Sequence, residues 1–256
     1  MKRIPMQSKS SCQSILFFQN LTLVYRWIGR TIGTCALVFG LFTGSHCSIT
    51  DTDSDQAINL ALLAFLSQTE FIPYSVTFKA TWSAATHSGG TLGIPANPHF
   101  SIPVGAVHSP VLNFWQTGQR ASNGLEKLAE NGDFTPVDSE MLNGGAISVF
   151  YGTAFDSPGS VTMKFSVTKD ASAVTLLSMV APSPDWFVGV GSVDLKEQGA
   201  FVSSKTMDLY MYDAGTDSGA AFIAADLDTN PQAPISLIAD TPLVGNPVGT
   251  FTFKRQ

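Results

Sequence analysis

Three aspartates in two short segments are the residues of this chain best suited to chemistry. Asp185 stands between Pro184 and an apolar run that begins at Trp186, while Asp213 and Asp217 lie four positions apart in a loop of small residues. Carboxylate oxygens are ligands that Ca²⁺ prefers, and calcium takes about six to eight oxygen ligands in proteins. The three side chains therefore indicate a site for a hard cation, with calcium as the first candidate.

The segments around these aspartates must bring them together. The two prolines before Asp185 restrict the backbone and hold it at the mouth of a strand. A turn at Gly215 would let Asp213 and Asp217 face one point, where three carboxylates repel each other unless a cation is bound. The spacing is not that of an EF-hand, because the twelfth position from Asp213 is Ala224. The alternative is that Asp213 and Asp217 only form Asx-type turn bonds.

The remaining polar residues do not indicate an enzyme. His87, His99 and His108 are separated by 12 and 9 positions, which fits no metal signature, and the sequence has no nucleophile elbow, Cys/His pair or HExxH motif. His108 lies in an apolar segment, where we expect a hydrogen-bonded core histidine. We therefore predict a non-catalytic protein without an organic cofactor. A hydrolase that uses His87, His108 and Asp185 is the less favoured alternative.

The charge of the chain is unevenly distributed. Residues 1–50 contain five of the 14 Lys and Arg residues and no acid, so residues 51–256 carry nine basic residues against 20 acids, a formal charge of −11. Affinity for nucleic acid depends on Lys and Arg at phosphates. The balance therefore predicts no nucleic-acid partner and suits an extracellular protein that binds cations.

The N-terminal segment is typical of an export signal. Basic residues lead to Arg30, and a mostly apolar run of 13 residues follows at positions 31–43, shorter than the roughly 20 residues of a membrane span. We predict a signal peptide or N-terminal signal anchor over residues 1–50 and a linker over 51–71, with a short helix or strand at 57–66. The protein is then secreted, or periplasmic in a Gram-negative bacterium, with no membrane span in its mature form.

The cysteines support the same interpretation. All three lie within the first 50 residues, at Cys12, Cys35 and Cys47. Removal of that segment would leave no cysteine, which excludes a disulfide framework, a zinc–thiolate site and a cysteine nucleophile. The fold must then depend on its apolar core.

From Pro73 onward the pattern is that of an all-β domain. Residues 74–82 alternate strictly between apolar and polar side chains, as in a strand with one buried face. Further strands are expected at 161–168, 174–181, 187–195, 205–212 and 248–254. Trp186 and Phe187 continue an apolar strand and are expected to be core residues. Many short strands with Gly and Pro turns predict an antiparallel β-sandwich.

Two short helices interrupt the strands. One runs from Asn123 to Asn131, with Asn123 and Glu126 in the spacing of a capping box and a glycine behind its end. The other starts at Thr135, has proline at its first helical position and stops at Gly144. Both helices are expected on one side of the sandwich.

Several motifs of this domain resemble the spondin-type domain of the F-spondin and mindin family. The most specific are Ser183-Pro-Asp-Trp-Phe-Val-Gly-Val190 and Asp213-Ala-Gly-Thr-Asp-Ser-Gly219. The resemblance extends upstream to Thr81-Trp-Ser83, Gly105-Ala-Val-His-Ser109, Trp115, Ala121-Ser-Asn-Gly-Leu125 and Ala129-Glu-Asn-Gly132. It covers residues 72–256.

The resemblance implies both a fold and a cofactor. The fold is an antiparallel β-sandwich of about eight strands with two short helices, similar to calcium-dependent membrane-targeting modules. One Ca²⁺ is implied, with ligands at Asp185, Asp213 and Asp217. Members of the family act in the extracellular matrix and in adhesion, so the implied partner is a cell-surface or matrix protein or a glycan. The alternative is a purely structural domain in which calcium stabilises the loops.

Two positions depart from the family pattern. Lys196 stands where animal members often have cysteine, which agrees with a cysteine-free domain. Ser166 stands where mindin-like members have a glutamate on the strand before the motif, so one calcium ligand is expected to be missing or replaced by water.

Overall fold

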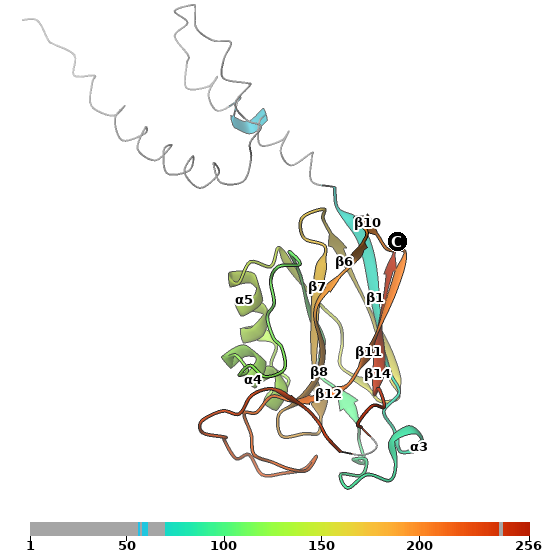
Figure 1. Ribbon diagram of the computed structural model, residues 1–256, viewed down its shortest axis with the longest axis vertical. Helices are drawn as coiled ribbons and strands as arrows, with labels where there is room; N and C mark the ends of the chain where they lie inside the picture. The colour runs from blue at the N-terminus through green and yellow to red at the C-terminus, as the bar shows by residue number, and fades with distance from the viewer. Residues whose placement is uncertain (1–55, 57, 61–69, 241–242) are drawn as a thin grey trace, which may run out of the picture. The chain divides into compact units, whose positions relative to one another are not determined.

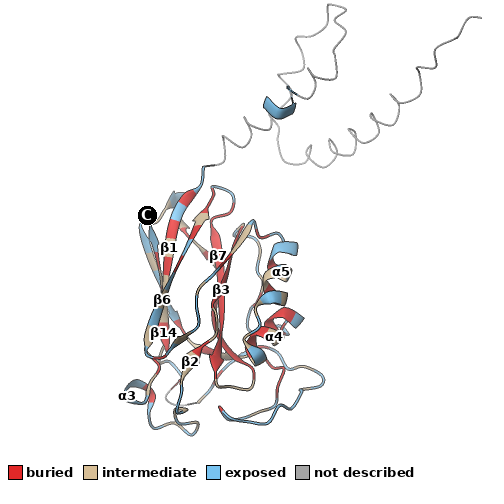
Figure 2. Ribbon diagram, turned by 180° about the vertical axis from the view of Figure 1, so that it is seen from behind, coloured by how far each residue is buried: buried red, intermediate tan, exposed pale blue. Residues whose placement is uncertain are grey.

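The first sheet of the domain consists of four strands whose side chains alternate in burial. The computed structural model describes residues 56, 58–60, 70–240 and 243–256. Four antiparallel strands pair in the order β11-β14-β1-β6. They are β1 (Ile72–Ala80), β6 (Gly159–Val167), β11 (Ser204–Leu209) and β14 (Gly249–Arg255). Every second side chain of β1 is buried, which confirms the alternation predicted there (Figure 2).

The second sheet is more deeply buried than the first. Its strands follow the order β13-β12-β8-β7-β2-β5, and β3 pairs with both β7 and β4. All residues of β7 and β3 are buried, because the other sheet covers one face and helices cover the opposite face (Figure 2). The strands are β2 (His99–Phe100), β3 (Val104–His108), β4 (Ser148–Tyr151), β5 (Phe155–Asp156), β7 (Ala173–Ala181), β8 (Trp186–Asp194), β12 (Met211–Asp213) and β13 (Ser236–Leu237). A separate hairpin pairs β9 (Lys196–Glu197) with β10 (Ala200–Phe201).

Helices α4 (Asn123–Asn131) and α5 (Thr135–Asn143) lie together on the outer face of the second sheet (Figure 1). Both predicted helices and both glycine ends are confirmed, but the predicted N-terminal cap of α4 is wrong. The cap is Ser122, whose hydroxyl oxygen accepts the N–H of Leu125, and Glu126 forms no capping box. A further helix, α3 (Ala84–His87), follows β1.

Two apolar cores result from this layering. The larger lies between the sheets and contains Trp186, while the smaller lies under the helices and contains Phe187. Consecutive side chains of a strand point to opposite faces, so the start of β8 contributes one aromatic ring to each core. The prediction that both are core residues is confirmed.

The chain changes sheets where a single strand was predicted. Residues 205–212 form the end of β11 in the first sheet and the start of β12 in the second, with Tyr210 between them. Leu209 and Met211 are both buried in the core between the sheets, so their alternation continues across the break. The predicted antiparallel β-sandwich is confirmed, and short strands such as β2, β5 and β13 add to the predicted set.

The N-terminal predictions lie almost wholly outside the described residues. Residues 1–55, with the predicted signal and the three cysteines, and 61–69 of the linker are not described. Gln56 and residues 58–60 are helical and exposed. The chain divides into Met1–Leu62 and Leu63–Gln256, and the second unit holds the sandwich.

Candidate metal centre

Asp185 is buried in the turn between β7 and β8, with 0% of its surface exposed. Its Oδ2 accepts the N–H groups of Thr216 at 2.7 Å and Asp217 at 3.1 Å, and the hydroxyl of Thr216 at 3.3 Å. Its Oδ1 is buried and has no hydrogen-bond partner. Burial raises the pKa of this carboxyl, against the effect of the two N–H donors. An unpartnered carboxylate oxygen in the interior is a position where a cation would be stabilising.

The turn that carries Asp185 is closed by Ser183. Its hydroxyl accepts the N–H of Trp186 at 3.1 Å and donates to the carbonyl of Val180 at 2.5 Å. The backbone carbonyl of Asp185 in turn accepts the N–H of Ala214 at 3.1 Å. The hydroxyl of Ser183 is therefore engaged in holding the turn, and the two loops are joined through their backbones.

Asp213 is the last residue of β12 and is half-buried. Its Oδ1 accepts the N–H of Gly215 at 2.7 Å, which is an Asx-type turn bond. Burial raises the pKa of Asp213 to about 6, and the nearby carboxyl of Asp185 adds to the rise. The residue lines a cavity of about 320 Å³ together with Trp186 and Asp240.

Asp217 is also buried, but its carboxylate is directed to its own loop. Oδ1 accepts the N–H of Gly219 at 2.6 Å, and Oδ2 accepts the N–H of Leu227 at 2.8 Å. The loop of residues 214–235 that these bonds close lies at the end of the sandwich opposite the C-terminus (Figure 1). The Asx-type bonds considered from the sequence are thus present at both Asp213 and Asp217.

The three predicted ligands lie in neighbouring positions, but their oxygens do not converge on one point. Across the part of the chain that the structure describes, no three acidic, histidine or cysteine side chains form a group able to hold a metal ion. Asp185 and Asp213 fit a cation best, through the unpartnered Oδ1 of one and the cavity beside the other. Each oxygen of Asp217 already accepts one hydrogen bond, which leaves its remaining lone pairs for a ligand role.

Ser166 does not lie beside these aspartates, contrary to the expectation from the family pattern. The strand before the motif is β7, whereas Ser166 belongs to β6 in the first sheet, where it pairs with Pro73. Ser166 lines a different surface cavity. The correction follows from the β6–β7 connection, which crosses from one sheet to the other.

The histidines lie in separate environments. His108 is buried, with Nε2 2.9 Å from the hydroxyl of Thr175 and Nδ1 2.9 Å from the carbonyl of Ser109. This confirms the predicted hydrogen-bonded core histidine. His87 is buried in α3, with Nδ1 2.8 Å from the hydroxyl of Thr86.

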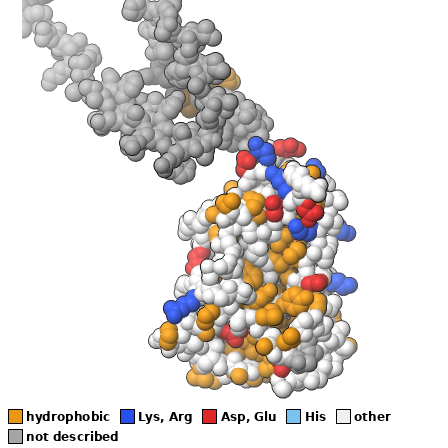
Figure 3. Space-filling view, in the orientation of Figure 1, with side chains coloured by type: hydrophobic (Ala, Val, Ile, Leu, Met, Phe, Trp, Pro, Cys, Tyr) orange, Lys and Arg blue, Asp and Glu red, His pale blue; other side chains and the backbone are white. Residues whose placement is uncertain are grey.

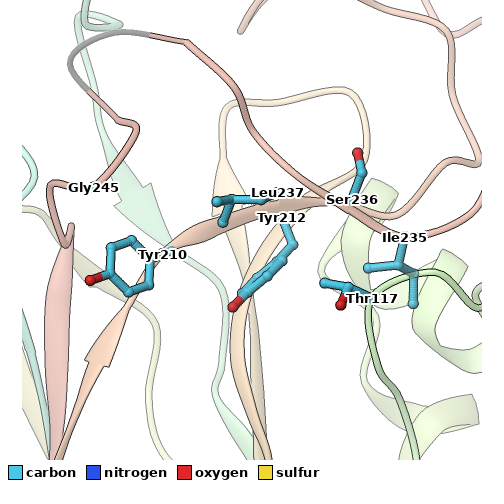
Figure 4. A pocket seen from close by; sticks show the side chains of 7 residues that line it. All are labelled: Thr117, Tyr210, Tyr212, Ile235, Ser236, Leu237 and Gly245. Carbon is cyan, nitrogen blue, oxygen red and sulfur yellow. The ribbon is translucent and has the colours of Figure 1, made fainter.

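A second cavity lies on the other side of β12 and was not predicted. It has a volume of about 590 Å³ and is lined by Thr117, Tyr210, Tyr212, Ile235, Ser236, Leu237 and Gly245. The hydroxyls of Tyr210, Tyr212 and Thr117 point to the same side of the cavity, while that of Ser236 points away (Figure 4). The ring of Tyr212 packs edge-on against Trp115, with the ring centroids 5.1 Å apart, and at a tilt against Phe187, with the centroids 5.6 Å apart. The sequence signal that could have indicated this cavity is the position of Tyr210 and Tyr212 on either side of Met211, which is buried.

Comparison with known proteins agrees with this structure. Residues 72–246 match the family described as Spondin_N. Human Spondin-2 is 31% identical over 188 residues, which cover 71% of this chain and 56% of the relative. Rat Spondin-2 is 32% identical over 189 residues, with 71% and 57% covered. Spondin-1 of Xenopus laevis is 34% identical over 173 residues, with 63% and 21% covered.

The matches cover only part of each relative. The chain spans about half the length of the Spondin-2 relatives and a fifth of Spondin-1. Among the described residues, no helix has both the length and the apolar character needed to cross a membrane. The chain belongs to the spondin family, whose members are secreted proteins of the extracellular matrix, and it is an extracellular protein.

Proposed function

We propose that this protein is a calcium-binding recognition or adhesion module without catalytic activity. The observation that carries the proposal is the environment of Asp185, a fully buried carboxylate with one oxygen lacking a partner. The negative charge of Asp217 raises the pKa of Asp185, and the charges of Asp185 and Asp217 both raise the pKa of Asp213, in addition to the effect of burial. A divalent cation would replace that repulsion with attraction.

Calcium would be held by Asp185, Asp213 and Asp217. Its chemistry there is electrostatic: the bound cation neutralises buried negative charge. Asp185 already receives two N–H groups from the 214–235 loop, so the carboxylate joins the β7–β8 turn to that loop. Water would complete the oxygen ligands, since three carboxylates alone do not fill a calcium shell.

The surroundings support a binding role over a catalytic one. The hydroxyl of Ser183 is engaged in its turn, and His108 is buried among Thr175 and Ser109. The tyrosine-lined cavity beside β12 offers a surface for recognition, with a size in the usual range of ligand pockets. The partner is a cell-surface or matrix protein or a glycan.

A thermal melt with and without calcium tests the metal. If calcium binds only the folded state, a concentration 100 times Kd adds about 2.7 kcal/mol of stability. We expect a rise in Tm for the wild type and none for Asp185→Asn or Asp213→Asn. The matched control is Asp226→Asn/Asp228→Asn, which removes two exposed acids of the same loop and keeps the shift. An unchanged wild-type Tm, or an equal shift in Asp185→Asn, would reject the site.

A purely structural role is the second candidate, favoured by the loop-closing bonds of Asp213 and Asp217. The two roles differ in what calcium controls beyond stability. Retention of the protein on extracellular-matrix extract, lost in Tyr210→Ala/Tyr212→Ala at full folding, supports recognition. If neither the wild type nor the variant is retained on the extract at saturating calcium, the structural role is supported. If the wild type hydrolyses an ester substrate and His108→Gln does not, the result would instead support the hydrolase alternative.

A further inference from the structure

The side chains on the outer face of the four-stranded sheet form rows that cross all four strands. Thr206, Thr252, Thr77 and Thr162 occupy the same level of β11, β14, β1 and β6, so they form a row across all four strands. The hydroxyl oxygens of Thr77 and Thr162 are 2.8 Å apart, and those of Thr206 and Thr252 are 3.2 Å apart. The row is a flat line of hydroxyl groups that reaches both edges of the sheet.

The rows on either side contain lysines. One row consists of Ser204, Lys254, Ser75 and Lys164, and the other of Asp208, Thr250, Lys79 and Ser160. All of these side chains are exposed or half-buried. The face thus has three lysines and one acid, in a domain whose overall formal charge is strongly negative. Figure 3 shows Lys and Arg side chains projecting from the side of the domain on which β1 and β14 lie.

The three lysines of this face differ in their partners from three other lysines of the domain. Lys127, Lys169 and Lys205 form ion pairs with carboxylates. Within residues 70–240 and 243–256, no ion pair includes the lysines of this face, at positions 79, 164 and 254. Their charges are therefore available to an anionic ligand.

We propose that this face, composed of the three rows above, binds an acidic polysaccharide that carries sulfate or carboxylate groups. Lys164 and Lys254 are two strands apart, about 9–10 Å, a spacing comparable with the disaccharide repeat of an extended chain. The threonine hydroxyls donate to and accept from sugar hydroxyls between the charged contacts. The inference goes beyond the recognition role proposed for the tyrosine-lined cavity, because it adds a second surface with its own ligand class.

Other anionic partners fit this face less well. A lipid surface would be bound more firmly by apolar side chains that enter the bilayer, and the three rows contain none. A single-stranded nucleic acid would be bound by aromatic stacking, and the rows contain no aromatic residue. A flat face of hydroxyls and separated lysines instead matches a polymer with many hydroxyls and regularly spaced anions.

Binding to immobilised heparin, as the sulfated probe, and to polygalacturonate, as the carboxylated probe, tests the proposal in the full secreted protein. We expect wild-type binding that weakens as salt rises, and a loss of about tenfold or more in Lys79→Gln/Lys164→Gln/Lys254→Gln. The matched control, Lys127→Gln/Lys169→Gln/Lys205→Gln, removes the same charge elsewhere and should stay within about threefold of wild type. Binding to one probe but not the other identifies the anionic group.

Two further variants complete the test. Thr77→Val/Thr252→Val keeps the strand shape and both lysine rows, and should reduce binding by removing hydroxyls only. Asp213→Asn should lose the calcium-induced shift in Tm while it still binds polysaccharide, which separates the two proposals. Absent wild-type binding to both probes, equal losses in the two lysine triples, or stronger binding to vesicles of anionic phospholipid would overturn the proposal.

Discussion

The carboxylate of Asp185 lies directly against the backbone of Thr216, whose N–H it accepts at 2.7 Å across two loops that are 31 residues apart in sequence. Replacement by alanine removes the acceptor for two buried N–H groups, so we expect Asp185→Ala to lower the free energy of unfolding by about 2–5 kcal/mol. Asp185→Asn keeps one acceptor oxygen and should cost less than half as much. Urea denaturation without calcium measures both, and equal losses would contradict the assigned bonds.

Gly215 and Gly199 offer a matched pair of glycines with left-handed backbones. Their φ angles are 76° and 82°, but a Cβ at Gly215 would lie 2.3 Å from the carbonyl oxygen of Ala233, whereas nothing lies within 4 Å at Gly199. We expect Gly199→Ala to cost about 1 kcal/mol from backbone strain, and Gly215→Ala about 2–4 kcal/mol because the loop must also move. Denaturation curves give the difference. Similar costs at the two positions would show that the close approach is absent.

Ser122 caps α4 although Asn123 is equally suited by type. Its hydroxyl accepts the N–H of Leu125 at 3.1 Å and donates to Glu140, whose other oxygen accepts the N–H of Gly124 at 2.7 Å. Ser122→Ala should therefore destabilise the domain by about 1–2 kcal/mol, and Asn123→Ala by less than about 0.5 kcal/mol. Urea midpoints measure both variants, and a larger loss for Asn123→Ala would return the cap to the residue expected from the sequence.

His108 predicts a pH dependence of stability. Burial lowers the pKa of this imidazole, since its charged form is poorly solvated there. The folded state then binds the proton less readily than the unfolded state, whose pKa is about 6.5. The contribution of His108 to the free energy of unfolding is therefore complete above about pH 6.5 and is lost as the pH falls below that value.

The measurement compares unfolding free energies at pH 7.5 and 5.0. His108→Gln should be less stable than wild type at pH 7.5, because the bond to Thr175 is altered, but should lose less stability on acidification. His99→Gln is the matched control for the His-to-Gln replacement, since His99 lies near the surface and forms only a local bond to Asn97. A steeper acid loss in His108→Gln would contradict the prediction.

The parts of the fold that follow local patterns could be read from the sequence. Alternation in β1 and β6, the glycine ends of α4 and α5, and the placement of Trp186 in the core all depend on neighbouring residues. Such patterns need only the side-chain period of a strand or helix and the backbone preferences of glycine.

Other features depend on partners that are distant in the chain. The cap of α4 is decided by Glu140, 18 residues after Ser122. The hydrogen bonding of Asp217 depends on Leu227, to which the loop folds back, so one oxygen of its carboxylate accepts a backbone N–H that lies 10 residues away in the sequence. Likewise, the passage from β11 to β12 keeps the alternation of a single strand, and only pairing with β14 and β8 shows that two sheets are involved.

Tyr212 and Asp213 are consecutive residues of β12, and their side chains face opposite sides of the sheet. One lines the tyrosine cavity and the other lines the cavity next to Asp185. The strand that separates them is three residues long and is held by β8 and β13. If a ligand in one cavity displaces β12 and so alters affinity in the other, the reciprocal effect must have the same factor.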